Sequence, residues 1–180
     1  MIGETVQPLP PEPGQPERFD YEYVRNGTAN LFMLSEPLAG WRSVLVTDRR
    51  TAKDFAEVVR GLAEDIHPEA ETIVLVMDNL NTHKLASLYE AFPPDQARRI
   101  AERIEVHHTP KHGSWLNVAE IELSVLSRQG LDRRIETVNE LVNEIDAWQS
   151  ERNDRKIGVR WRFTTADARI KLRRLYPAIE

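Results

Sequence analysis

Asp78 and Glu120 are the two acidic residues whose positions indicate chemistry. Asp78 follows an apolar run in "TIVLVMDN", and an unbroken run of that length is typical of a buried strand. Glu120 lies in "SWLNVAEIELSVLSR", which predicts a helix with apolar side chains on both faces. A carboxylate near a core becomes neutral, pairs with a cation or holds a metal ion. These two acids are therefore the first candidates for a functional site.

The helix that carries Glu120 has clear signals at its start. Pro110 and Gly113 favour a turn, and Ser114 is a good N-cap. The pattern predicts a helix over residues 115–128, with Glu120 in its second turn and buried on both sides.

A shared metal ion would explain both acids. Forty-one residues separate Asp78 from Glu120, which is enough for a helical excursion and a return strand. Such a path can bring both acids to one edge of a sheet, where sites in α/β proteins lie. Two adjacent carboxylates repel each other unless a cation lies between them. Because the chain has no cysteine, the oxygen ligands favour Mg²⁺ or Mn²⁺, which can activate water against a phosphodiester.

Structural interpretations of the same residues stay open. Residues 78–81 can form a turn that caps the next helix. Glu120 can pair with Lys111 or Arg128 instead of a metal ion.

The histidines give a weaker signal than the acids. His107 and His108 are neighbours on a short predicted strand, so one should face the core and one the solvent, which argues against a shared metal. His112 and His83 can be surface residues, or can contact a phosphate and support the acids.

The elements that must position the acids are those of an α/β domain with a mixed sheet flanked by helices. Two strands at 29–37 and 41–48 form a predicted hairpin, and Thr51 caps the next helix. The remaining predicted elements are a strand at 72–79, helices at 83–92 and 94–104, a strand at 104–110, and helices at 115–128, 136–153 and 165–176.

Composition limits the class of protein. The chain has 180 residues, a net charge of −5 and no apolar run of membrane-spanning length or signal-peptide type, so we expect a cytoplasmic protein with no membrane partner. Residues 152–174 carry a charge of +7, which leaves −12 elsewhere. This asymmetry indicates either a basic DNA-binding surface or a solvated helix face. Five prolines in residues 1–18 predict an irregular arm before one domain at 19–180.

Two long motifs resemble one family. "VLVMDNLNTHK" and "HHTPKHGSWLNVAEIELSVLSRQGLDRR" look like the second and third acid motifs of mariner-like DDE transposases of bacterial insertion sequences. "YVRNGTANLF" and "WRFTTADARIKLRRLYP" extend the resemblance over nearly the whole chain.

The resemblance implies a fold and a reaction. The fold is RNase H-like, and Asp78 and Glu120 match the second and third catalytic acids, which bind Mg²⁺ (or Mn²⁺) for DNA strand cleavage and strand transfer. A homodimer on the DNA is implied as well. The implied DNA-contacting residues are Lys111, His112, Asn117, Arg169, Lys171 and Arg173. The implied supporting residues are Asn79 and His83.

The first acid of the family has no counterpart in the chain. Its position falls before Met1, and Glu4 and Asp20 do not occupy the motif position. The resemblance therefore predicts the C-terminal catalytic portion of a transposase, lacking the first strand and its Asp. The alternative is an inactive remnant that binds DNA or an intact transposase.

Overall fold

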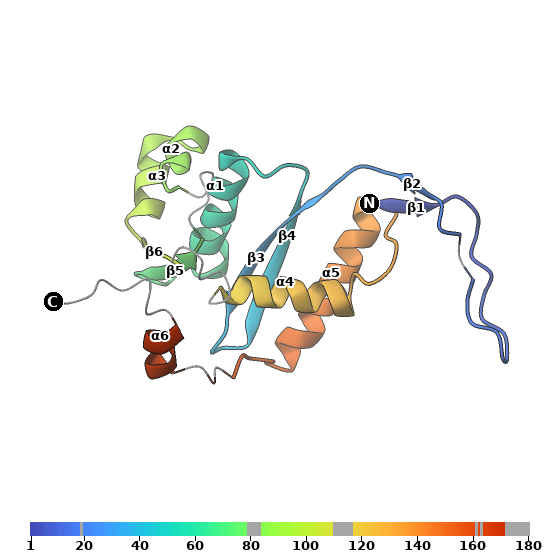
Figure 1. Ribbon diagram of the computed structural model, residues 1–180. Coiled ribbons are helices and arrows are strands. Elements are labelled where there is room, and N and C mark those ends of the chain that lie inside the picture. Colours follow the sequence, from blue (N-terminus) through green and yellow to red (C-terminus); the bar gives the residue numbers. More distant parts are fainter. Residues whose placement is uncertain (19, 79–83, 110–116, 161, 163, 172–180) are drawn as a thin grey trace.

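The computed structural model describes residues 1–18, 20–78, 84–109, 117–160, 162 and 164–171. The described elements form an α/β arrangement, which confirms the predicted class (Figure 1). In chain order they are β1 (Ile2–Glu4), β2 (Tyr23–Arg25), β3 (Asn30–Glu36), β4 (Trp41–Thr47), α1 (Ala52–Arg60), the π-helical segment η1 (Gly61–Ile66), β5 (Ile73–Met77), α2 (Ser87–Ala91), α3 (Pro94–Ala101), β6 (Ile104–His108), α4 (Val118–Gln129), α5 (Val138–Asp154) and α6 (Thr165–Lys171). None of the helices in this part of the chain has the length and apolar character that crossing a membrane requires.

The β3–β4 hairpin is the central element, and its prediction is confirmed. The strands pair antiparallel from Asn30 opposite Thr47 to Glu36 opposite Trp41. Side chains alternate between the two faces of the hairpin, so each face contributes to a different core. Phe32 packs with α1, β5 and α3, whereas Val44 packs with α4 and α5. The hairpin therefore joins two hydrophobic cores.

The helix after the hairpin also forms as its sequence predicts. The Thr51 side chain accepts a hydrogen bond from the Asp54 backbone N–H, and the Asp54 carboxylate accepts one from the Thr51 N–H. This capping box satisfies two backbone donors at the start of α1. Phe55, Val58 and Val59 are buried, and η1 extends the helix to Ile66.

Strand β5 is not the fully buried strand that its apolar run predicts, because one of its faces is exposed. Ile73, Leu75 and Met77 of β5 pack in the first core, but Val74 and Val76 are each 59% exposed. A short apolar run does not show how many faces are covered, because valine is common on both faces of a strand. Within the described residues β5 pairs only with β6, in parallel, and the strands form three two-stranded sheets instead of the one mixed sheet predicted.

The N-terminal arm is more ordered than its prolines predict. β1 pairs antiparallel with β2, and isolated bridges join Leu9 to Arg18 and Glu12 to Gln15. Residues 2–25 thus fold back as a long ribbon that extends away from the helices (Figure 1). Proline is compatible with such a ribbon because edge positions need no backbone donor. The domain division at residue 18 stays a prediction.

Gly40 fixes the hairpin turn against the end of α5. Its φ is +68°, and a Cβ added there would lie 2.5 Å from the carbonyl carbon and oxygen of Lys156. Both observations require glycine, because L side chains disfavour this φ and the obstacle is backbone. We expect Gly40→Ala to lower the free energy of unfolding by about 1–3 kcal/mol, measured by urea denaturation. Gly14, with a φ of +83° and open space around it, is the matched control. An equal loss in Gly14→Ala would contradict the role of the contact.

Candidate active site

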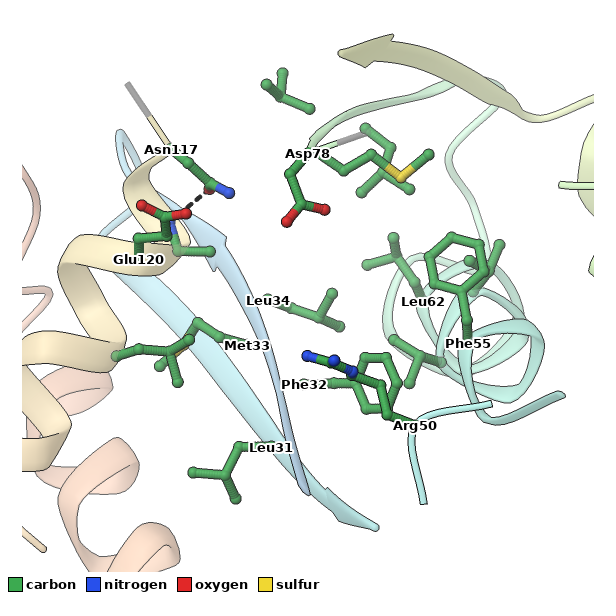
Figure 2. Close-up of a pocket in the computed structure, with 17 residues that line it drawn as sticks. Leu31, Phe32, Met33, Leu34, Arg50, Phe55, Leu62, Asp78, Asn117 and Glu120 are labelled. Atoms are coloured by element: carbon green, nitrogen blue, oxygen red, sulfur yellow. Dashed lines mark hydrogen bonds between the residues drawn. The ribbon is translucent and has the colours of Figure 1, made fainter. Parts of the chain in front are cut away.

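Asp78 and Glu120 line one cavity. Asp78 directly follows β5, and Glu120 lies in the first turn of α4. The cavity has a volume of about 200 Å³, and its walls are mostly apolar side chains of β3, β5 and α1. Figure 2 shows both carboxylates at the same end of this cavity, directed toward the space between them. The structure therefore brings together the two acids that the sequence singles out.

The helix that carries Glu120 begins later than predicted. Asn117 is its N-cap, and the Asn117 side-chain oxygen accepts a hydrogen bond from the Ala119 backbone N–H at 3.1 Å. Asparagine caps a helix as well as serine does, which explains the shift from the predicted start at 115. Ser114 lies outside the described residues. Glu120 is therefore in the first turn and not the second, where the positive end of the helix dipole favours an acid.

The prediction that Glu120 is buried is wrong. Glu120 is exposed at the mouth of the cavity, and within the described part of the chain it forms no ion pair. Its predicted alternative partner Arg128 does not contact it, and Lys111 lies outside the described residues. The buried acid of α4 is Glu122, with 3% of its surface exposed. Residues 120 and 122 lie about 200° apart around a helix, so they face opposite directions.

Glu122 pairs with two arginines from other elements. Its Oε2 lies 3.0 Å from Nε of Arg42 on β4, and both carboxylate oxygens accept hydrogen bonds of 3.1 Å from Nη2 of Arg152 on α5. Arg152 also lies over the Trp148 ring, 5.0 Å from its centroid. Burial lowers the pKa of Arg42 below its ordinary value, and the charge of Glu122 opposes that shift. Glu122 has no signal in the sequence, because no motif marks the arginines that pair with it.

Arg152 is therefore not part of an exposed basic surface. The side chain is 12% exposed and is paired with Glu122, which corrects its place among the predicted basic residues. Arg169 and Lys171 are exposed on α6, and none of the α6 residues 166–171 belongs to either core. Among the described residues of 152–174, Arg152 therefore does not add to a basic face.

The other predicted site residues divide into two groups. Asn117 lines the cavity beside Glu120 (Figure 2). The remainder lie outside the described residues: Asn79, His83, Lys111, His112 and Arg173.

The pair His107 and His108 differs from its prediction. Both are exposed at the end of β6, so neither faces the core, and His107 Nε2 lies 2.7 Å from the Glu105 carboxylate.

Arg50 is a cavity residue that the sequence analysis missed. It follows β4 in the loop before α1, and its guanidinium group projects into the cavity across from the acids (Figure 2). Arg50 is exposed and forms no ion pair with another described residue. A guanidinium group in the same cavity as the two acids can bind a phosphate, because its planar donors match phosphate oxygens. The only sequence signal was its position just beyond a strand end.

The residues at the mouth of the cavity suit a hard cation. The two carboxylates are ligands of the type that Mg²⁺ and Mn²⁺ take, with water in the remaining positions. No cluster of three or more histidine, aspartate or glutamate side chains suited to a metal ion occurs among the described residues. The ligands that the described residues supply therefore number fewer than in a fully enclosed site.

Asp78 after strand β5 and Glu120 in the first turn of α4 thus line one cavity of an α/β domain, an arrangement compatible with metal-dependent hydrolysis. A family model described as DDE superfamily endonuclease matches residues 3–142, which is most of the chain and includes Asp78 and Glu120. The chain belongs to the DDE superfamily endonucleases. Comparisons with curated proteins and with solved structures gave no match.

Proposed function

We propose that the protein is a mariner-like transposase domain of a bacterial insertion sequence, which cleaves DNA strands and transfers them to a target in the presence of Mg²⁺ or Mn²⁺. The observation that carries the proposal is that Asp78 and Glu120 face one space. Membership of the DDE superfamily endonucleases supports DNA as the substrate. The order of strands and helices is compatible with an RNase H-like fold.

Each residue has a proposed role. Asp78 and Glu120 hold the metal ion, which when bound supplies an activated water and charge stabilisation at the phosphodiester. Asn117 orients Glu120 through the helix cap. Arg50 binds a phosphate next to the acids, while Lys111, His112, Arg169, Lys171 and Arg173 contact the DNA backbone and Asn79 and His83 support the acids. We also propose a homodimer on the DNA and a cytoplasmic location.

A nicking assay tests the proposed function. Supercoiled plasmid is incubated with the protein and about 5 mM Mg²⁺ or Mn²⁺, on the order of the concentration that occupies a weak metal site. The nicked form of the plasmid is then quantified. We expect metal-dependent nicking that falls at least about a hundredfold in Asp78→Ala, because a metal ligand is lost. Asp95→Ala, on the exposed first turn of α3, is the matched control and should keep the activity. Equal nicking by Asp78→Ala would count against the proposed site.

A second candidate function has one observation in its favour. Two acids line the cavity within the described residues, not three. A domain with an incomplete ligand set can bind DNA, or an intact transposase, without cleaving. We expect such a remnant to give no nicking while binding DNA without sequence preference and with a steep salt dependence.

Arg50 gives a prediction that holds for both candidates. We expect Arg50→Ala to weaken DNA binding about threefold to tenfold at 50 mM salt, and to reduce the slope of log affinity against log salt by about 1, because one phosphate contact is removed. Arg49→Ala is the control, because the exposed Arg49 precedes Arg50 but does not line the cavity. Equal effects of the two substitutions, in fluorescence anisotropy with labelled duplex, would rule out a specific contact by Arg50.

A further inference from the structure

We infer that Glu122 is a positioning residue for Glu120: the buried contacts of Glu122 with Arg42 and Arg152 fix the rotation of α4 so that Glu120 faces Asp78. The inference rests on the proposed function, in which Glu120 is a metal ligand. Its geometric part, however, can be measured without metal or DNA.

The burial pattern of α4 makes Glu122 the most firmly held residue near Glu120. In the first two turns, residues 118–125, Glu122 is the one side chain that is buried. The apolar neighbours Val118, Ala119 and Leu123 are only partly buried. Hydrophobic contacts therefore hold this end of the helix loosely, and the next buried side chain is Leu126, one turn further along. The Glu122 carboxylate is the main fixed point near Glu120.

The two arginines that pair with Glu122 are themselves held firmly by β4 and α5. Arg42 donates from Nη1 to the Asn153 side-chain oxygen at 3.2 Å and from Nη2 to the Ile157 carbonyl. The Arg42 backbone also exchanges hydrogen bonds of 2.9 and 2.8 Å with the Asn153 side chain. Val44 N–H donates to Gln149 at 2.9 Å, so side chains of α5 bond the outer edge of β4. The two arginines thus belong to one rigid unit of β4 and α5.

Glu120 and Glu122 point in opposite directions from α4. A rotation of about 200° separates residues 120 and 122. When Glu122 points at Arg42 and Arg152, Glu120 must point away from α5. That direction is the cavity, where Asp78 lies. Any rotation of α4 that releases Glu122 moves Glu120 out of register with Asp78.

Stability alone does not account for three buried charged groups. A buried ion pair gains little over apolar side chains of the same volume, because its charges lose their hydration. Within the described residues Nε of Arg152 is buried without a hydrogen bond, and Nε of Arg42 has its 3.0 Å contact with Glu122 but no well-aligned hydrogen bond, which adds to that cost. The charged groups add a directional contact between α4 and the β4–α5 unit, which hydrophobic side chains would not supply.

Cysteine crosslinking tests the geometry without metal. The chain has no cysteine, so Asp78→Cys with Glu120→Cys gives a protein with two thiols, whose crosslinking by a short bifunctional thiol reagent reports whether they face each other. We expect the crosslinking rate to fall at least about tenfold when Glu122→Gln is added, because glutamine removes the charge and keeps the shape. Ile100→Ala, buried on α3 in the first core, is the control that lowers stability without touching α4.

Each outcome decides the inference. A slower crosslinking rate in folded Glu122→Gln, with the rate unchanged in Ile100→Ala, supports the positioning role. An unchanged rate in folded Glu122→Gln overturns it. If Glu122→Gln does not fold, Arg152→Gln is measured instead, because it leaves the pair of Glu122 with Arg42 in place. A slower crosslinking rate in folded Arg152→Gln then supports the positioning role, and an unchanged rate overturns it.

A second readout separates this inference from the proposed function. In the chain with both acids intact, we expect Glu122→Gln to weaken Mn²⁺ binding about tenfold to a hundredfold. If the unsubstituted chain binds no Mn²⁺, the proposed function fails, while the crosslinking rate still decides whether Glu122 positions residue 120.

Discussion

Glu122→Leu is expected to reduce the free energy of unfolding by about 3–5 kcal/mol, the largest stability loss that we expect from a single substitution in this protein. The loss follows from burial. Arg42 and Arg152 have side-chain exposures of 2% and 12%, and both would keep a charge with no counter-charge beside it. Burial and, after it, repulsion from Arg152 already lower the pKa of Arg42, and that repulsion would add to the loss. Urea denaturation measures the change.

A triple substitution separates the charge from the packing. Replacing all three residues at once, Glu122, Arg42 and Arg152, by leucine or methionine should recover most or all of the lost stability, because no buried charge then remains. Glu144→Leu is a surface control for the single change, since the partly exposed Glu144 pairs with the exposed Arg133. We expect it to change stability by less than about 1 kcal/mol. A loss below about 1 kcal/mol in Glu122→Leu would contradict the described ion pairs.

Glu120→Gln, unlike Glu122→Leu, is expected to keep its stability without metal and to lose the metal-dependent activity. In metal-free buffer the melting temperature should stay the same or rise slightly, because Glu120 is exposed and its repulsion from Asp78 is removed. In 10 mM Mg²⁺ the unsubstituted protein should gain stability through binding to the folded state, and the variant should gain none. Metal-dependent nicking should disappear with it.

Differential scanning fluorimetry with and without EDTA measures the effect of Glu120→Gln. Glu105→Gln is the matched control, because Glu105 is exposed on β6 and does not line the cavity. The control should keep the full shift with Mg²⁺. A clear fall in the melting temperature of Glu120→Gln in EDTA would show that Glu120 has a structural partner and is not kept for a metal ion.

Local signals in the sequence predict much of the fold. The β3–β4 hairpin follows from alternating apolar residues around a turn, and α1 follows from Thr51 with apolar positions at helical spacing. α5 also forms as predicted, with Leu141, Ile145 and Trp148 buried on one face. These elements depend on contacts between residues close in sequence, which a pattern records.

Features that depend on distant contacts could not be predicted. The exposure of Val74 and Val76 depends on which strands lie beside β5, which no local period encodes. The burial of Glu122 depends on Arg42 and Arg152, which are 80 and 30 residues away in the chain. The same reason explains why the buried acid of α4 was assigned to Glu120.

The candidate site shows the same division. Asp78 and Glu120 were found because each has an unusual local setting and both belong to long motifs. Arg50 was missed because an arginine after a strand is common, and only the folded chain places it in the cavity. The N-terminal ribbon was missed because prolines predict irregular backbone, although pairing between residues 2 and 25 needs only the residues between them.

A double-substitution cycle for Mn²⁺ binding tests the central claim most directly, namely that Asp78 and Glu120 hold one ion together. Mn²⁺ affinity is measured by isothermal titration calorimetry for the unsubstituted chain, Asp78→Asn, Glu120→Gln and the double variant. We predict that each single change weakens binding at least about tenfold and that the double change adds little more, because the ion is already lost. Additive effects, or no effect of either change, would contradict a shared metal site.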